Sequence, residues 1–154
     1  MSILGALRRV TGGAAEVDLT IGEAKRGSKA KVTVDVHVGS AAVKAKRIYV
    51  KLQATETVDI PRFSVPAPVG QSGGSQTVRV QESETVVSQE FLIAEGQEIP
   101  AGSTQQFTAE IDIPSTGLPT LIGKIIAVKW QALAGLDVAW STDPSSGWKE
   151  ITVT

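Results

Sequence analysis

The chain has 154 residues with one histidine, no cysteine and a net charge of −1 at pH 7. The absence of cysteine excludes disulfides, thiolate metal sites and a cysteine nucleophile, and a single histidine excludes His-rich metal sites. Apolar residues make up 42% and charged residues 20%, which is typical of a folded soluble protein. The length indicates one domain over residues 1–154.

The charges are unevenly divided along the chain. Residues 1–54 hold ten Lys and Arg against four Asp and Glu, whereas residues 55–154 hold five against twelve. Such a division indicates either a partner-binding surface or two halves that attract each other as neighbouring strands. The near-zero total gives no global field that would attract nucleic acid or a membrane surface.

The first residues have the spacing of a short helix. Ile3, Leu4, Leu7 and Val10 fall on one helical face, which predicts a leader helix over residues 1–11. A helix this short needs docking to be stable, so we expect it to cover an open end of the fold. A frayed terminus is the alternative.

Strict alternation of β-branched and polar residues begins at residue 29. Residues 29–38 place five apolar side chains on one face, and residues 47–54 repeat the pattern after a short connection at 39–42. This period of two predicts half-buried strands. We interpret the two runs as an antiparallel hairpin with one face in a core.

The polar faces of these two strands carry a basic stripe. Lys31, Arg47 and Lys51, together with Lys29 and Tyr49, are predicted to lie on it. The first three are candidate contacts for an anionic partner, although a solvated sheet face explains the stripe equally well.

Residues 61–75 contain three prolines and three glycines and are predicted to form a long mobile hairpin loop. Its apolar side chains, Phe63, Val65 and Val69, are candidate partner contacts. A recognition element and a disordered tip are both open interpretations.

Alternation recurs along the rest of the chain. The predicted strands lie at 17–19, 76–80, 84–93 (after a polar turn at 81–83), 107–113, 126–134 and 151–153. About eight strands separated by turn signals indicate an all-β fold, a single antiparallel β-sandwich. Residues 121–136 also fit helical spacing, and a helix there is the alternative. The predicted core is Val34, Val36, Ile48, Val50, Leu52, Phe107, Ile111, Val128 and Trp130.

No export or membrane segment is recognisable. Arg8 and Arg9 are not followed by a hydrophobic run, and the most apolar stretch, 121–140, contains Lys124, Lys129 and Asp137. We therefore expect a cytoplasmic protein with no transmembrane segment.

No catalytic constellation emerges from the residues. His37 lies on the polar face of a strand without a surrounding motif, and the aspartates are dispersed. The glycines at 70–74 lack the lysine and helix of a phosphate-binding loop. We expect no enzyme activity, no metal, no cofactor and no nucleic-acid partner.

A series of short motifs resembles the N-terminal domain of the arrestin superfamily, in particular its bacterial sporulation-control branch. They are Ile3–Leu7 with Gly12–Asp18, Lys46–Leu52 followed by Thr55-Glu56, Phe91, Ile99–Gly102, Phe107–Pro114, Lys129-Trp130, Gly135–Val138 and Asp143-Pro144. Two features depart from this pattern. The usual Pro-Gly before the second strand is replaced by Ala24–Gly27, and the chain has length for one sandwich where relatives usually carry two.

The resemblance implies an arrestin N-domain-like, immunoglobulin-like sandwich and a non-enzymatic adaptor or regulator. The first functional hypothesis is therefore a protein-interaction module with an unknown protein partner. A structural homo-oligomer built through sheet edges is one alternative. A carbohydrate-binding sandwich that stacks sugars on Tyr49, Trp140 and Trp148 is the other.

Overall fold

The computed structural model describes residues 15–66, 70, 74–139 and 142–154, and these residues form strands, turns and loops but no helix. The strands are β1 (Ala15–Ile21), β2 (Lys29–Val38), β3 (Val43–Pro66), β4 (Ser75–Ile99), β5 (Thr104–Asp112), β6 (Leu121–Ile122), β7 (Ile126–Val138) and β8 (Lys149–Ile151). No helix long and apolar enough to cross a membrane occurs in the described ranges. The predicted leader helix, residues 1–11, lies outside them.

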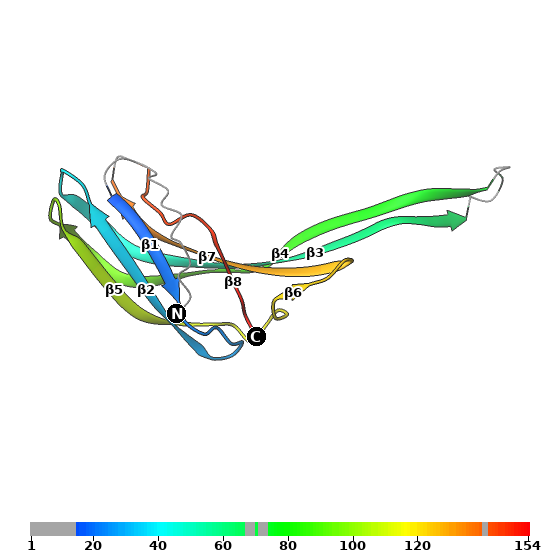
Figure 1. Cartoon of the computed structure of the whole chain (residues 1–154), viewed down its shortest axis with the longest axis horizontal. Helices are drawn as coiled ribbons and strands as arrows, with labels where there is room; N and C mark the ends of the chain where they lie inside the picture. Colours follow the sequence, from blue (N-terminus) through cyan, green and yellow to red (C-terminus); the bar gives the residue numbers. More distant parts are fainter. Residues whose placement is uncertain (1–14, 67–69, 71–73, 140–141) are drawn as a thin grey trace.

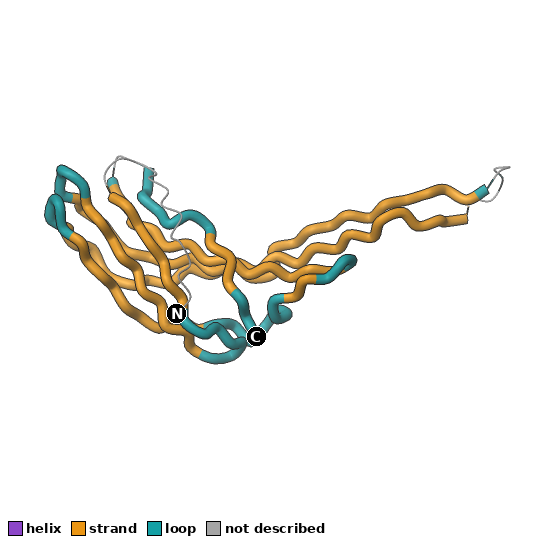
Figure 2. Tube along the Cα trace, in the orientation of Figure 1, coloured by secondary structure: helices purple, strands orange, loops and turns teal. Residues whose placement is uncertain are grey.

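The strands form two antiparallel sheets that pack face to face (Figure 1). The smaller sheet has the order β1-β2-β5, and the larger has the order β4-β3-β7-β6, with β8 also paired to β7. Figure 2 shows the long paired strands of the larger sheet continuing well beyond the smaller one. The predicted antiparallel β-sandwich is thus confirmed.

The core lies between the inner faces of the two sheets. Alternate residues of β2, from Ala30 to Val38, and of β3, from Ile48 to Ala54, are buried against each other and against β7. Of the predicted core residues, eight are buried and Phe107 packs partly buried at the core's edge. The burial of one face follows directly from the alternation, because neighbouring side chains on a strand point to opposite sides.

The predicted hairpin between residues 29–38 and 47–54 is wrong. β2 pairs with β1 and β5, whereas β3 pairs with β4 and β7, so the connection at 39–42 carries the chain from one sheet to the other. Alternation shows which face of a strand is buried. Two consecutive strands that lie in different sheets of a sandwich also bury one face each against the same core. The pattern therefore does not distinguish hydrogen-bonded neighbours from facing ones.

The ambiguous segment 121–136 forms strands and not a helix: β6 covers residues 121–122, a short connection covers 123–125, and β7 begins at 126. β7 runs from Ile126 to Val138 and continues through Gly135. Gly135 pairs directly with Tyr49 of β3, and a Cβ built on Gly135 would lie 2.5 Å from the Tyr49 hydroxyl. The Tyr49 ring therefore lies against the glycine backbone, and β7 does not break where the glycine occurs.

Gly135→Ala is expected to lower the free energy of unfolding by about 1–3 kcal/mol, because the added methyl must displace the Tyr49 ring. Gly22→Ala is the matched control, since its Cβ would meet ordinary contacts at 3.6 Å. That control should change stability by less than about 1 kcal/mol. Urea unfolding of both variants tests the difference, and equal midpoints would contradict the close packing of Tyr49.

Two predictions for the region between residues 61 and 83 are corrected by the structure. Residues 61–66 and residue 75 are strand and not loop, and the expected turn at 81–83 lies inside β4. Pro61 is accommodated because it falls at a register shift between Ile60 and Phe63, where β3 has an extra residue and no ladder donor is needed. Pro66 ends the strand.

Candidate interaction surface

The strands β3 and β4 extend together beyond the sandwich as a two-stranded arm. β7 pairs with β3 only as far as Val58, which lies opposite Ile126. Beyond that point β3 pairs with β4 alone, up to Pro66 opposite Ser75. We call residues 58–66 and 75–82 the arm; it extends the larger sheet beyond the sandwich, and none of the other described strands stacks on it (Figure 1).

The arm has one apolar face. Cross-strand partners share a face, and the pairs Ile60–Val80 and Phe63–Val78 are both apolar. The apolar face comprises Val58, Ile60, Phe63, Val65, Val78 and Val80, all of them half-buried. At the base of the arm it meets Ile126, whose exposure is 46%. It therefore continues the inner, core-facing side of the larger sheet out into solvent.

The opposite face of the arm is polar. Arg79 donates hydrogen bonds from Nε and Nη2 to Asp59, at 3.2 and 3.0 Å, and this contact lowers the pKa of Asp59. The hydroxyls of Thr57 and Ser83 are 3.4 Å apart across the strands. Both partners of each pair are solvent-facing, so this side of the ribbon does not require a covering layer.

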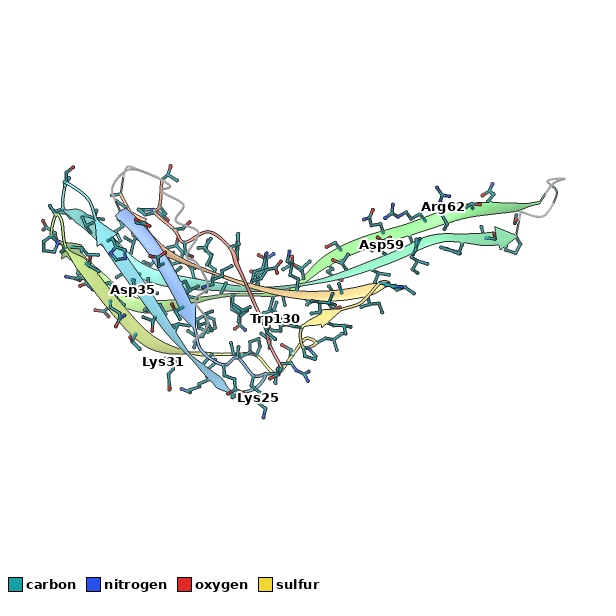
Figure 3. The ribbon with its side chains drawn as sticks, in the orientation of Figure 1. Lys25, Lys31, Asp35, Asp59, Arg62 and Trp130 are labelled. Atoms are coloured by element: carbon teal, nitrogen blue, oxygen red, sulfur yellow. The ribbon has the colours of Figure 1, made fainter. Side chains whose placement is uncertain are left out.

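A bulge at Pro61 and Arg62 keeps the apolar face continuous. Three steps along β3, from Ile60 to Phe63, correspond to two steps along β4, from Val80 to Val78. Without the extra residue, Phe63 would lie on the polar side, because a shift of one residue inverts the face. Arg62 adopts a positive φ of 32°, a conformation that costs free energy in a non-glycine residue. Figure 3 labels Arg62 and Asp59 on the arm.

Acidic side chains occupy the apolar side of the arm at its base. Glu56 lies directly opposite Glu84, and Glu82 lies opposite Val58. Together with Ser83 these residues line a shallow hollow of about 150 Å³. Like charges directly opposite each other on a sheet repel. We call Glu56, Glu82 and Glu84 the acidic base; among the described residues, no group of three or more His, Cys, Asp or Glu side chains is arranged to hold a metal ion.

Arg47 and Lys51 lie on the outer face of the larger sheet, beside Tyr49. The Arg47 guanidinium is 3.3 Å from Asp137 and 3.1 Å from Glu90. Arg47 and Lys51 both lie over the Tyr49 ring, at 5.1 and 5.4 Å from its centroid. Arg47 is therefore already neutralised by neighbouring carboxylates, which weakens it as a contact for an anionic partner.

Tyr49 is the only tyrosine of the chain, and its hydroxyl donates a hydrogen bond to Asp143 at 3.2 Å. Burial of the ring, together with the nearby Asp143 carboxylate, raises the pKa of Tyr49 to about 12. The protonated phenol is thus favoured in the folded state. The corresponding stability is complete below pH 10 and is lost as the pH rises from 10 towards 12.

Absorbance at 295 nm is therefore expected to show a tyrosinate midpoint near 12 in the folded protein and near 10 after denaturation. The associated loss of stability across this window is about 2–3 kcal/mol, because each of the two pKa units corresponds to about 1.4 kcal/mol. Asp143→Asn removes the carboxylate and should lower the midpoint, while burial keeps it above 10. A midpoint at 10 in the folded wild-type protein would contradict the buried hydrogen bond.

The six predicted contact residues do not form one surface. Phe63 and Val65 lie on the apolar face of the arm, while Val69 lies outside the described residues. Lys31 lies on the outer face of the smaller sheet (Figure 3), on the opposite side of the sandwich from Arg47 and Lys51. The predicted single basic stripe is wrong, because β2 and β3 belong to different sheets.

Comparison with known proteins identifies the fold. No family model matches the sequence, and the search of curated proteins finds no match. Among solved structures, the chain is similar to the crystal structure of Spo0M, sporulation control protein, from Bacillus subtilis, with a TM-score of 0.61 and 22% sequence identity. The similarity covers 92% of this chain and 49% of the Spo0M chain.

The two proteins share a fold. At the level of the fold, this similarity agrees with the sandwich that the sequence resemblance implies. This chain spans about half the length of Spo0M.

The sequence analysis identifies Phe63 and Val65 as contact candidates but assigns them to a loop, and it misses the full length of the arm and its acidic base. The signal that was present is the apolar spacing at Val58, Ile60, Phe63 and Val65, which changes from two to three and back to two. This change marks a bulge inside one strand, and it was obscured by the prolines at 61 and 66.

Proposed function

We propose that this chain is a non-enzymatic, arrestin-like protein-binding module that acts in regulation in the cytoplasm, with the arm as its binding element. The observation that carries the proposal is the apolar face of the arm, which no other strand of the described residues covers. An isolated two-stranded ribbon is only marginally stable in water, and a further layer over its apolar side stabilises it. A protein partner would supply that layer.

The position of the apolar face supports this function. It continues the core-facing side of the larger sheet through Ile126, whereas the polar face carries the Asp59–Arg79 pair. Apolar surface that extends beyond a finished core is typical of protein-interaction sites. The similarity to a sporulation control protein supports a regulatory role of the same kind.

The carbohydrate-binding alternative is weakened by the geometry of Tyr49. Its exposure is 5%, and its ring lies against Gly135 beneath Arg47 and Lys51. It therefore presents no free face on which a sugar could stack. Trp148 is 45% exposed and accessible, but the buried Tyr49 cannot serve as a second stacking surface beside it.

The test compares two charge insertions on opposite faces of the arm. Ile60→Asp places a carboxylate on the apolar face, and Thr77→Asp places one on the polar face. Each variant serves as bait in a quantitative pull-down from the native cell. Ile60→Asp should capture at least tenfold less partner than wild type, and Thr77→Asp should capture the same amount as wild type. Equal capture by both variants would contradict binding through the apolar face.

A further inference from the structure

The uncovered side of the arm combines two chemical features in a fixed order. The apolar face runs along the ribbon towards its tip, and the acidic base lies at the other end, where Glu56 and Glu84 oppose each other. Neither glutamate forms an ion pair within the described part of the chain. A segment that fits this surface must therefore be apolar along one side and cationic at one end.

One segment of this chain has that composition. Residues 3–10 place Ile3, Leu4, Leu7 and Val10 at helical spacing, and Arg8 and Arg9 lie between the last two of them. These residues lie outside the described ranges, so the comparison rests on their sequence. Their apolar side chains match the apolar face, and the two arginines match the three carboxylates of the acidic base.

The segment of the same molecule cannot reach its own arm. Ala15, where β1 begins, pairs with Val38, and β3 starts just beyond at Val43, at the opposite end of the sandwich from the arm (Figure 1). From Val43 to Val58 the strand spans roughly 50 Å at about 3.3 Å per residue. Eight residues from Ala15 back to Leu7 span at most about 28 Å when fully extended.

We propose that residues 3–10 of a second copy of this chain bind the apolar face and acidic base of the arm. Because each copy carries one such segment and one arm, the exchange can be mutual and closes a two-fold dimer. The inference rests on the proposed function in using the same arm as a protein-binding element, and it names the partner as a second copy.

Charge reversal in the full-length chain tests this contact on both sides. The leader variant is Arg8→Glu with Arg9→Glu, and the arm variant is Glu56→Lys with Glu84→Lys. Each variant alone places like charges at both contacts of a dimer. In an equimolar mixture, both contacts between the two different variants have opposite charges.

The measurement is molar mass by light scattering after size-exclusion chromatography, with circular dichroism to confirm that each variant is folded. Wild type should have twice the 16.1 kDa chain mass. The dimer dissociation constant of each variant alone should be at least tenfold higher than that of wild type. The equimolar mixture should regain the dimer mass. Arg62→Glu, on the polar face, is the matched control and should remain dimeric.

The inference is overturned if wild type stays at 16.1 kDa at the highest attainable concentration, if either variant remains as dimeric as wild type, or if the mixture fails to regain the dimer. Should the arm variant be unfolded, Glu82→Lys alone takes its place in the same mixing scheme. Failure here is distinguishable from failure of the proposed function. A monomeric wild-type protein that still loses its captured partner in Ile60→Asp retains the protein-binding arm and excludes only the second copy.

Discussion

Replacing residues 59–81 with Asn-Gly is expected to leave the sandwich folded and to abolish capture of the protein partner. Val58 and Glu82 lie directly opposite each other, so a two-residue turn can join them without altering the register. The buried core of the described chain contains Ala54 and Val87 but no residue between them. The removed segment therefore contributes no core packing.

The expected thermal result for this shortened protein is a melting temperature within a few degrees of wild type, since about 1 kcal/mol shifts a domain of this size by only a few degrees. Circular dichroism melting and the pull-down are measured on the same preparation. If the shortened protein fails to fold, the arm is part of the folding unit and its assignment as a separate binding element is wrong.

Trp130→Ala is expected to lower the free energy of unfolding by about 3–5 kcal/mol, the range typical of removing a buried aromatic ring. Trp130 is fully buried in the middle of β7, and its indole Nε1 donates a hydrogen bond to the Leu118 carbonyl at 2.9 Å. The substitution leaves a cavity and removes the hydrogen bond to the Leu118 carbonyl. Since domains are stable by only about 5–15 kcal/mol, the variant should be close to unfolding at 37 °C.

Trp148→Ala provides the matched control for this effect. Its side chain is 45% exposed, so its loss should cost less than about 1 kcal/mol. Urea titration of both variants, followed by the change in molar ellipticity, gives the two free energies. A Trp130→Ala protein as stable as the Trp148→Ala protein would show that the core is not centred on β7.

The inner faces of the strands could be predicted from the sequence because burial and side-chain periodicity are directly linked. The alternation at 29–38 and 47–54 located most of the core correctly. The partners of these strands could not be predicted in the same way. The backbone of a β-branched strand can form hydrogen bonds with any neighbouring strand, so its sequence does not select the partner. Only the complete fold places β2 and β3 in different sheets.

The arm was misjudged because proline and glycine usually mark loops. At Pro61 the missing amide donor is tolerated by the bulge, and at Pro66 by the end of the strand. Residues 81–83 resemble a turn because all three are polar: Gln81 and Ser83 lie on the polar face of β4, and Glu82 belongs to the acidic base on the opposite face. Phe63 and Val65 were identified as apolar contact candidates, but their continuity with Ile60 and Val80 depends on a register that the sequence does not reveal.

Site-specific photo-crosslinking tests most directly whether the apolar face of the arm is the protein-binding surface. A benzophenone side chain is placed at Phe63 in one protein and at the adjacent Ser64, on the polar face, in another. Irradiation in the native cell is expected to produce a covalent adduct with a protein at position 63 and little or none at position 64. Adducts of equal yield at the two positions, or none at position 63, would contradict the account.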